Sequence, residues 1–182
     1  MRIIAGTARS RRLVAPDSKG TRPVTDRVRE AVFSSIGDWV ESAAVLDLYA
    51  GSGSFGLEAL SRGATRATFV ENGHKALGAL RKNVEAVGLG GTVVSSSVED
   101  FLKRSDGSFD LVFMDPPWPL GRDEIETALA RVDRLVDAQA EIIISRRHSD
   151  EVPTPPESWR VATNRRYGDT RILRYEKEGQ DQ

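Results

Sequence analysis

The chain contains no cysteine and only two histidines, His74 and His148, which lie far apart in its 182 residues. Without cysteine there is neither a disulfide nor a thiolate metal site, and two distant histidines do not suggest a metal centre. No apolar run approaches the ~18 consecutive residues that a membrane span needs, and no signal-peptide pattern opens the chain. These absences predict a cytoplasmic protein that binds no metal and contacts no membrane.

Positive charge is concentrated near the N-terminus. Residues 1–30 carry eight arginines and lysines against three acids, although the whole chain has a net charge of −1. A basic segment on an otherwise mildly acidic protein indicates that the protein binds a polyanion through one region of its surface. For any one of these side chains, the alternative to a contact with the polyanion is a solvated position on the surface. The best candidates for contacts with nucleic-acid phosphates are Arg9, Arg11, Arg12 and Arg22.

The pattern of apolar residues divides the chain into an extension, one domain and a tail. Residues 1–24 predict a basic extension that contains a short β-hairpin, formed by 2–4 and 12–14 around a polar turn. Residues 25–178 predict one domain, which begins with a helix capped by Thr25. Residues 179–182 are expected to be a frayed terminus.

Within the domain, strand and helix patterns alternate. Strands are expected at 45–49, 67–71, 92–95, 110–114 and 141–145, and helices at about 55–62, 73–87, 98–104 and 122–136. Two final strands, 158–162 and 170–176, predict an antiparallel pair joined through 164–169. Apolar strands that alternate with helices predict an α/β, Rossmann-like fold, with a seven-stranded, mostly parallel sheet covered on both faces and an antiparallel closing hairpin.

A glycine-rich turn follows the first predicted strand. Gly51 and Gly53 permit tight turning and close approach of the backbone to a ligand. Asp47, just before the turn, would repel the pyrophosphate of a dinucleotide but attract the ammonium and sulfonium groups of S-adenosylmethionine. Glu71 ends the second predicted strand, where a carboxylate can bind ribose hydroxyls. Together these residues favour S-adenosylmethionine over NAD as the cofactor.

Further cofactor candidates lie on neighbouring loops. Val98, Glu99 and Asp100 follow the third predicted strand, where Asp100 could bind the adenine amine and Val98 could offer a backbone contact. With equal weight, Asp100 could only cap or flank a helix. The remaining candidates adjoin the glycine turn or Glu71: Tyr49, Ser52 and Asn72.

The residues Asp115, Pro116, Pro117 and Trp118 follow a buried apolar strand and are the candidates for catalysis. The Asp115 carboxylate and the carbonyl between the prolines can accept hydrogen bonds from an exocyclic amine, and the carboxylate would also face the cofactor. The prolines stiffen the segment. Trp118 offers a stacking face, which is worth about 1–3 kcal/mol per base. The tetrapeptide indicates methylation of an amino group on a nucleobase.

With these motifs, the chain resembles class I S-adenosylmethionine-dependent methyltransferases, and more specifically the bacterial 16S ribosomal RNA (guanine-N2) methyltransferase family. The resemblance covers nearly the whole chain, at residues 3–6, 12–16, 21–33, 47–53, 70–71, 83, 115–117 and 167–170. Two positions depart from the family pattern: Trp118 stands where phenylalanine is common, and Ser34 where asparagine is usual. The resemblance implies a monomer that acts on 16S rRNA in the assembled or assembling small ribosomal subunit.

Several alternatives remain open. An adenine-N6 DNA methyltransferase could use the same tetrapeptide, although the chain has no room for a sequence-reading domain. A protein-glutamine methyltransferase, a Rossmann dehydrogenase and a non-catalytic RNA-binding or assembly factor are further alternatives. A cytosine-C5 enzyme is disfavoured because its nucleophile is normally a cysteine. Trp39 and Trp159 are expected to be core or packing residues rather than platforms for a base. Residues 146–148 could touch substrate or form a solvated loop.

Overall fold

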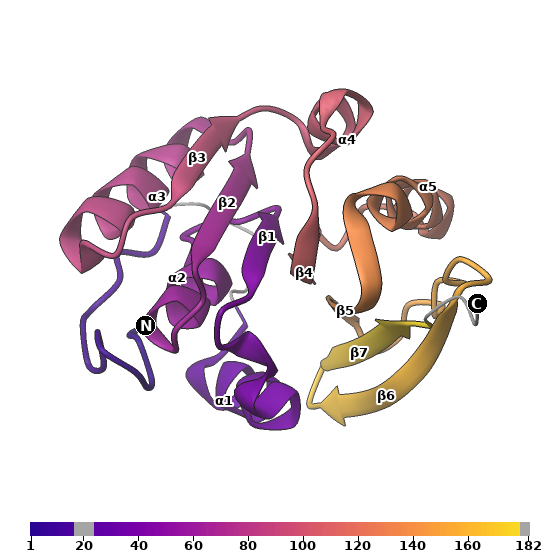
Figure 1. Cartoon of the computed structure of the whole chain (residues 1–182), viewed down its shortest axis with the longest axis horizontal. Coiled ribbons are helices and arrows are strands. Elements are labelled where there is room, and N and C mark those ends of the chain that lie inside the picture. The colour runs from indigo at the N-terminus through magenta and orange to yellow at the C-terminus, as the bar shows by residue number, and fades with distance from the viewer. Residues whose placement is uncertain (17–23, 179–182) are drawn as a thin grey trace.

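A seven-stranded sheet with the order β3-β2-β1-β4-β5-β7-β6 forms the centre of the molecule (Figure 1). This computed structural model describes residues 1–16 and 24–178; the loop expected over 17–23, the tail expected over 179–182 and the candidate Arg22 lie outside these ranges. The strands are β1 (Ala44–Leu48), β2 (Arg66–Glu71), β3 (Thr92–Ser95), β4 (Phe109–Met114), β5 (Val136–Arg147), β6 (Trp159–Tyr167) and β7 (Thr170–Lys177). β1 to β5 run parallel, and β7 is antiparallel to both β5 and β6. The predicted fold class is confirmed.

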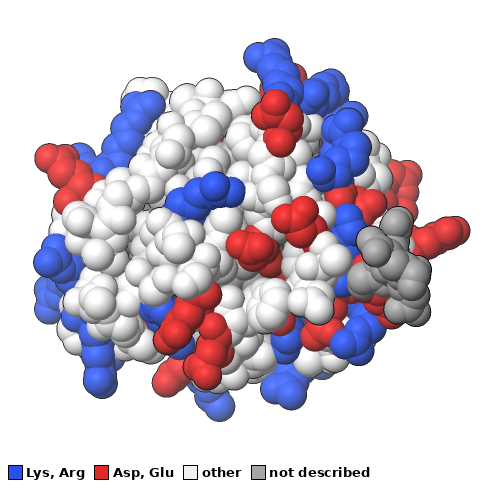
Figure 2. All heavy atoms as spheres, in the orientation of Figure 1, with Lys and Arg blue, Asp and Glu red and all other residues white. Residues whose placement is uncertain are grey.

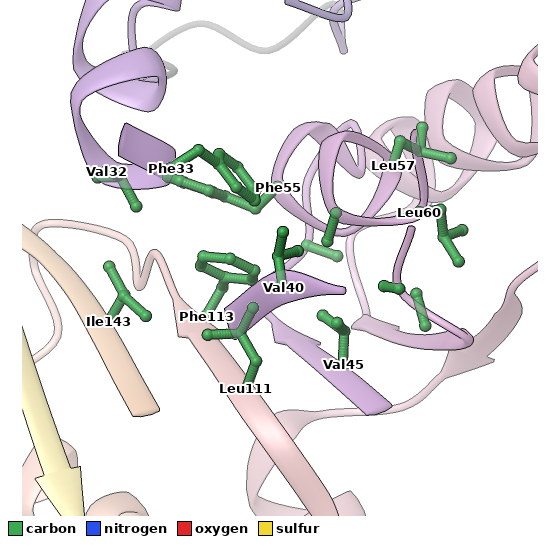
Figure 3. Close-up of a cluster of buried hydrophobic side chains, with 14 of the residues drawn as sticks. Val32, Phe33, Val40, Val45, Phe55, Leu57, Leu60, Leu111, Phe113 and Ile143 are labelled. Carbon is green, nitrogen blue, oxygen red and sulfur yellow. The ribbon is translucent and has the colours of Figure 1, made fainter. Parts of the chain in front are cut away.

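Helices cover both faces of the sheet. They are α1 (Asp26–Ile36), α2 (Ser54–Ser61), α3 (His74–Val87), α4 (Val98–Arg104) and α5 (Arg122–Val132), with 3₁₀ turns η1 (Gly37–Val40) and η2 (Asp133–Leu135). Alternate residues of a strand face opposite sides, so Val45 packs with α1, α2 and α3 while Leu46 packs with α4 and α5. In the first of these cores the rings of Phe55 and Phe113 stack at 4.8 Å between centroids, and Phe33 tilts against both (Figure 3).

Three predicted element boundaries were wrong by more than two residues. The helix expected over 122–136 ends at Val132 and continues as η2, and β5 starts at Val136 rather than 141. The early part of β5 is polar and exposed and carries a register shift opposite β4 and a positive φ at Gln139, which hid it from the apolar pattern. β6 runs on to Tyr167 rather than stopping at 162, because an edge strand tolerates exposed polar residues on both faces.

The two arms of the expected N-terminal hairpin do lie antiparallel: Arg2 and Arg12 form a bridge, Ile3 N–H donates to the Arg11 carbonyl at 2.9 Å, and Leu13 N–H donates to the Met1 carbonyl at 3.1 Å. Residues 1–16 also pack on α2. The buried carboxylate of Glu58 accepts hydrogen bonds from the backbone N–H groups of Ile4 at 2.7 Å and Ala5 at 3.0 Å. Because Glu58 also pairs with Arg62 at 2.8 Å, a buried charge is compensated and the N-terminal segment is held in place.

Other local expectations can be checked directly. Thr25 caps α1 by accepting a hydrogen bond from Val28 N–H, and Gly168, with a φ of 62°, forms the turn between β6 and β7. Trp159 is buried, whereas Trp39 is 41% exposed and so lies outside the core. On the face shown in Figure 2, basic and acidic side chains are interspersed. None of the helices within 1–16 and 24–178 is long and apolar enough to cross a membrane.

Candidate active site

The carboxyl ends of β1, β2 and β4 meet at one edge of the sheet. β1 has β2 on one side and β4 on the other, so the chain changes direction there, and such a switch point is where open α/β sheets bind ligands. The glycine turn follows β1, Glu71 ends β2, and the tetrapeptide 115–118 follows β4. The fold therefore gathers at one edge three motifs that are separate in the sequence.

The turn after β1 has an unusual backbone. Tyr49, Gly51 and Gly53 all have positive φ, and for Tyr49, at 58°, such a conformation costs about 1–3 kcal/mol. A Cβ atom on Gly53 would lie 2.5 Å from the Leu80 side chain, so a larger residue does not fit. Gly56 similarly lets α2 pack closely on Phe69 of β2, since a Cβ there would lie 2.4 Å from the ring. Gly53 and Gly56 thus allow the turn and α2 to pack closely on α3 and β2.

Asp47 lies beneath this turn and is 1% exposed. Its Oδ2 accepts a hydrogen bond of 2.9 Å from Gly56 N–H in the first turn of α2. Burial raises the pKa of Asp47 well above its ordinary value, and the charges of Asp115 and Glu71 add to this, while the hydrogen bond from Gly56 opposes it. The carboxyl group therefore positions α2 and, when it is ionised, places a buried negative charge beneath the turn.

Glu71 ties the glycine turn to the start of α3. Its Oε2 accepts from Gly51 N–H at 2.9 Å, and its Oε1 accepts from Asn72 N–H at 2.9 Å and Gly73 N–H at 2.7 Å. A carboxylate has about four acceptor positions, so these bonds leave capacity for a ligand hydroxyl. Its position at the end of β2 is as predicted, but the sequence did not indicate that Glu71 also organises the surrounding backbone.

A cavity of about 480 Å³ lies above the glycine turn and beside Glu71. The candidates Tyr49, Gly51, Ser52, Asn72 and Asp115 line it together with Glu71 and Pro117. Pro16 and Val24 also line it, although no sequence motif indicated them. Their contribution means that the segment before α1 forms part of the cavity wall.

An adjoining cavity of about 290 Å³ shares Tyr49 and Asn72 with the first one and is also lined by Val98 and Glu99. Asp100 is engaged elsewhere: its N–H donates to the Ser97 hydroxyl at 3.0 Å, and its Oδ2 accepts from that hydroxyl at 2.9 Å. This reciprocal pair caps α4. Asp100 therefore has the helix-capping role that was the alternative to binding the adenine amine. The structure thus brings Val98 and Glu99, but not the Asp100 carboxylate, to the cavity.

Asp115 is held by the end of β5. The Ser145 hydroxyl donates a hydrogen bond to its carboxylate, and the positive charge of Arg146 lies nearby. Burial nevertheless raises the pKa of Asp115 to about 6, while Ser145 and Arg146 both act to lower it. The carboxylate is therefore mostly ionised at pH 7 and available as an acceptor.

The tetrapeptide separates two cavities. Asp115 and Pro117 line the cavity above the glycine turn, Pro116 is buried, and Trp118 lines a third cavity of about 360 Å³. These two cavities have no lining residue in common. A ligand in one and a ligand in the other would thus meet across Asp115-Pro116-Pro117-Trp118.

Arg146, which was expected from the sequence either at the substrate or in a solvated loop, and Ser145, which was not a candidate, both lie beside Asp115. Arg146 is 4% exposed, donates to the Leu120 carbonyl at 2.9 Å and pairs with Asp150 at 2.8 Å. Burial lowers the pKa of Arg146, and Asp150 and Asp115 counteract this. The only sequence signal for Arg146 was its position after an apolar strand. For that reason residues 146–148 were expected either at the substrate or in a solvated loop.

The basic candidates of the N-terminal segment lie away from this edge. Arg9, Arg11 and Arg12 are exposed, and Arg11 Nη1 donates to the carbonyl of Ala86 near the end of α3. α3 starts at the cavity with His74 and has 14 residues, so Ala86 lies roughly 20 Å from its start at ~1.5 Å per residue. If a polyanion binds at the tetrapeptide, these arginines can therefore contact only those of its phosphates that lie far from the tetrapeptide.

Comparison with known proteins agrees with this architecture. A family described as "Conserved hypothetical protein 95" matches residues 1–176. Ribosomal RNA small subunit methyltransferase D of Escherichia coli (strain K12) is 36% identical over 181 residues, which cover 99% of this chain and 91% of the relative. The protein of the same name from Haemophilus influenzae is 34% identical over 173 residues, covering 92% of this chain and 89% of the relative.

Solved structures give the same result. The structure titled "Putative methyltransferase yhhF from Escherichia coli" matches with a TM-score of 0.87 and 34% identity, and the match covers 99% of both chains. Both the sequence match and the structural match therefore extend over nearly the whole chain, N-terminal segment included. The chain belongs to the small-subunit ribosomal RNA methyltransferase D family, which has the class I methyltransferase fold.

Proposed function

We propose that the chain transfers a methyl group from S-adenosylmethionine to the exocyclic N2 amine of a guanine in 16S rRNA. The observation that carries this proposal is the shared wall: Asp115 and Pro117 face one cavity, and Trp118 faces the other. A methyl donor and a base that occupied the two cavities would meet at the tetrapeptide. The names of the relatives, which are ribosomal RNA small subunit methyltransferases, support the choice of RNA.

The residues around the larger cavity fit S-adenosylmethionine. Asp47 and Asp115 both have a raised pKa because burial is not fully offset by positive charge. A ligand that carries an ammonium and a sulfonium would supply that charge, whereas a pyrophosphate would be repelled. Glu71 would hold the ribose hydroxyls, the turn from Tyr49 to Gly53 the amino-acid portion, and Val98 and Glu99 the adenine. The cofactor supplies an already activated methyl group.

Asp115 and the Pro116 carbonyl orient the amine. The lone pair of a guanine N2 is delocalised into the ring, so the nitrogen is a poor nucleophile. When the two acceptors bind its two hydrogens, the nitrogen is drawn toward tetrahedral geometry and its lone pair points at the methyl carbon. Catalysis is then mostly positioning, with Ser145 and Arg146 holding the carboxylate. The nitrogen–carbon bond forms as the carbon–sulfur bond breaks, and water removes the surplus proton.

In this proposal the N-terminal segment binds the RNA substrate. Arg9, Arg11 and Arg12 bind phosphates at a distance from the target base, as the basic part of the extension expected over 1–24. The base itself leaves its stack to reach the tetrapeptide, so the target is a loop or a flexible single-stranded nucleotide. The chain acts as a monomer, in the cytoplasm, on the assembled or assembling small subunit.

The test is methyl transfer from labelled S-adenosylmethionine to under-methylated small subunits, naked 16S RNA and duplex DNA, followed by nucleoside analysis. N2-methylguanosine on the subunits is the expected result. N6-methyladenine on DNA would retain the chemistry of Asp115 and overturn the substrate. Absence of transfer to all of them would favour a binding or assembly factor. The Asp115→Ala variant should lose turnover while it still binds S-adenosylhomocysteine.

A further inference from the structure

The third cavity is built by loops that the mechanism above does not use. It lies between the loop after β5 and the β6–β7 hairpin. Its walls are Trp118, Arg147, His148, Ser149, Arg166 and Asp169. At about 360 Å³ it is within the size range of small-ligand sites. An aromatic face and two arginines are the groups that bind a base and its phosphates.

Arg147 covers the face of Trp118. Its guanidinium carbon lies 4.5 Å from the centre of the indole ring. Arg147 is the last residue of β5 and is exposed, so no packing holds its side chain in that position. A base that stacks on this face of Trp118 needs the space that the guanidinium occupies. The contact is therefore one that a base would have to displace.

Arg166 approaches the same cavity from another strand. Its Nε donates to the carbonyl of Gly168 at 2.8 Å, which fixes the guanidinium at the β6–β7 turn. The positive character of the site is visible at His148, whose pKa is lowered by burial and then by the charges of Arg166 and Arg171. One acid, Asp169, also lines the cavity. The balance favours a ligand with negative charge.

We propose that Arg147 is a positioning residue that covers the stacking face of Trp118 until the target base displaces it. Arg147 and Arg166 then bind RNA phosphates next to that base. The proposal rests on the proposed function, since it names the RNA-binding residues of the same site. When the base enters, the guanidinium leaves the indole. An exposed cation–aromatic contact is weaker than base stacking, and the released arginine gains a charge-assisted phosphate contact, so the exchange is favourable.

Single substitutions at the cavity test this assignment. Arg147→Ala and Arg166→Ala are compared with Arg165→Ala, because Arg165 is the exposed neighbour on β6 whose side chain points to the other face of the strand. The readouts are the affinity for under-methylated small subunits, measured with S-adenosylhomocysteine bound and at several salt concentrations, and the KM and kcat for methylation. Affinity for S-adenosylhomocysteine alone checks that each variant is folded.

Arg147→Ala and Arg166→Ala should each weaken subunit binding about tenfold and reduce the salt slope by roughly 0.7–0.9, the effect of one lost phosphate contact. Arg147→Lys should restore the slope, because it keeps a charge that can reach phosphate. Arg165→Ala should match the unsubstituted protein. Equal effects of Arg147→Ala and Arg165→Ala, or an unchanged slope for both cavity variants, would overturn the proposal. The binding readout does not need turnover, so failure of the proposed methylation appears separately, in the unsubstituted protein.

Discussion

Asn83 donates a hydrogen bond of 2.9 Å from its side-chain amide to the carbonyl of Ser52 in the glycine turn. The same side chain donates to the Val14 carbonyl at 2.9 Å and accepts from Val14 N–H at 2.8 Å. Asn83 is 1% exposed and its bond to Ser52 is buried, whereas its two bonds to Val14 are partly buried. One buried amide on α3 thus joins the N-terminal segment to the wall of the cofactor cavity.

Asn83→Ala should therefore impair both stability and cofactor binding. The substitution leaves backbone groups of Val14 and Ser52 without partners, at a cost of about 1–3 kcal/mol for each one that stays buried. We expect a clear loss in the free energy of unfolding, measured with urea, and weaker binding of S-adenosylhomocysteine by calorimetry. Asn164→Ala, at an exposed position on β6, is the control. Unchanged affinity in a destabilised Asn83 variant would separate the two effects and contradict the coupling.

The pH dependence of methylation should follow Asp115. Its pKa is raised to about 6 by burial, and only the ionised carboxylate can accept both from the amine and from Ser145. Activity should thus rise with pH through about 6 and reach a plateau above it, with about a tenth of the plateau one unit below the pKa. The measurement is kcat/KM for RNA against pH. Asp115→Asn should give a low and flat profile; a profile unchanged by the substitution would exclude this role.

Asp47→Asn should raise stability while it weakens cofactor binding. Burial raises the pKa of Asp47 in the folded state, so above the ordinary Asp pKa the carboxylate is less favourably placed in the folded protein than in the unfolded chain, where it is solvated. Asparagine keeps an oxygen for Gly56 N–H and removes the charge. At pH 7 we expect a higher Tm, by about 2–4 °C for each 1 kcal/mol gained. The advantage should shrink as pH falls through the folded-state pKa toward the ordinary Asp value, because the native carboxyl becomes protonated.

Thermal unfolding from pH 4 to pH 8 and titration with S-adenosylmethionine measure the two effects of Asp47→Asn. A lower Tm at pH 7 would indicate that the hydrogen bond to Gly56 outweighs the buried charge. Unaltered affinity would place Asp47 outside cofactor recognition.

Charge reversal at Arg11 and Arg12 should weaken RNA binding without changing the chemical step. Both arginines lie near the far end of α3, so they can add affinity but cannot orient the base. The double variant to glutamate should flatten the salt dependence of binding, while kcat at saturating RNA stays unchanged. Arg81→Glu, at an exposed position on α3, controls for net charge. An unaltered salt slope in the double variant would count against phosphate contacts in the N-terminal segment.

The parts of the site that were predictable from sequence are those made by consecutive residues. The turn at 49–53 and the tetrapeptide at 115–118 each follow an apolar strand. Their backbone conformations depend on glycines and prolines, which can be recognised in a short sequence. Pro16, Arg146 and Ser145 reach the site from segments distant in sequence, so their contacts there depend on the fold, and only Arg146 was considered from the sequence as a residue that could touch substrate. Glu71 was placed correctly, but its bonds to three backbone N–H groups depend on the folded turn.

The fold errors have a related cause. The strand pattern relied on continuous apolar residues, which holds for central strands such as β1 and β4 that are buried on both faces. β6 is at the sheet edge, where residues such as Asn164 and Arg165 are exposed. The start of β5 projects beyond the core in the same way. Where the sheet meets solvent, pairing and not burial determines how far a strand extends.

The shared wall at 115–118 has a kinetic consequence. The cavities on its two sides have no lining residue in common, so neither ligand depends on the residues that line the other cavity. We therefore expect that either reactant can bind first and that initial-rate patterns are those of a random sequential reaction. A compulsory order would show that bound RNA covers the cofactor cavity.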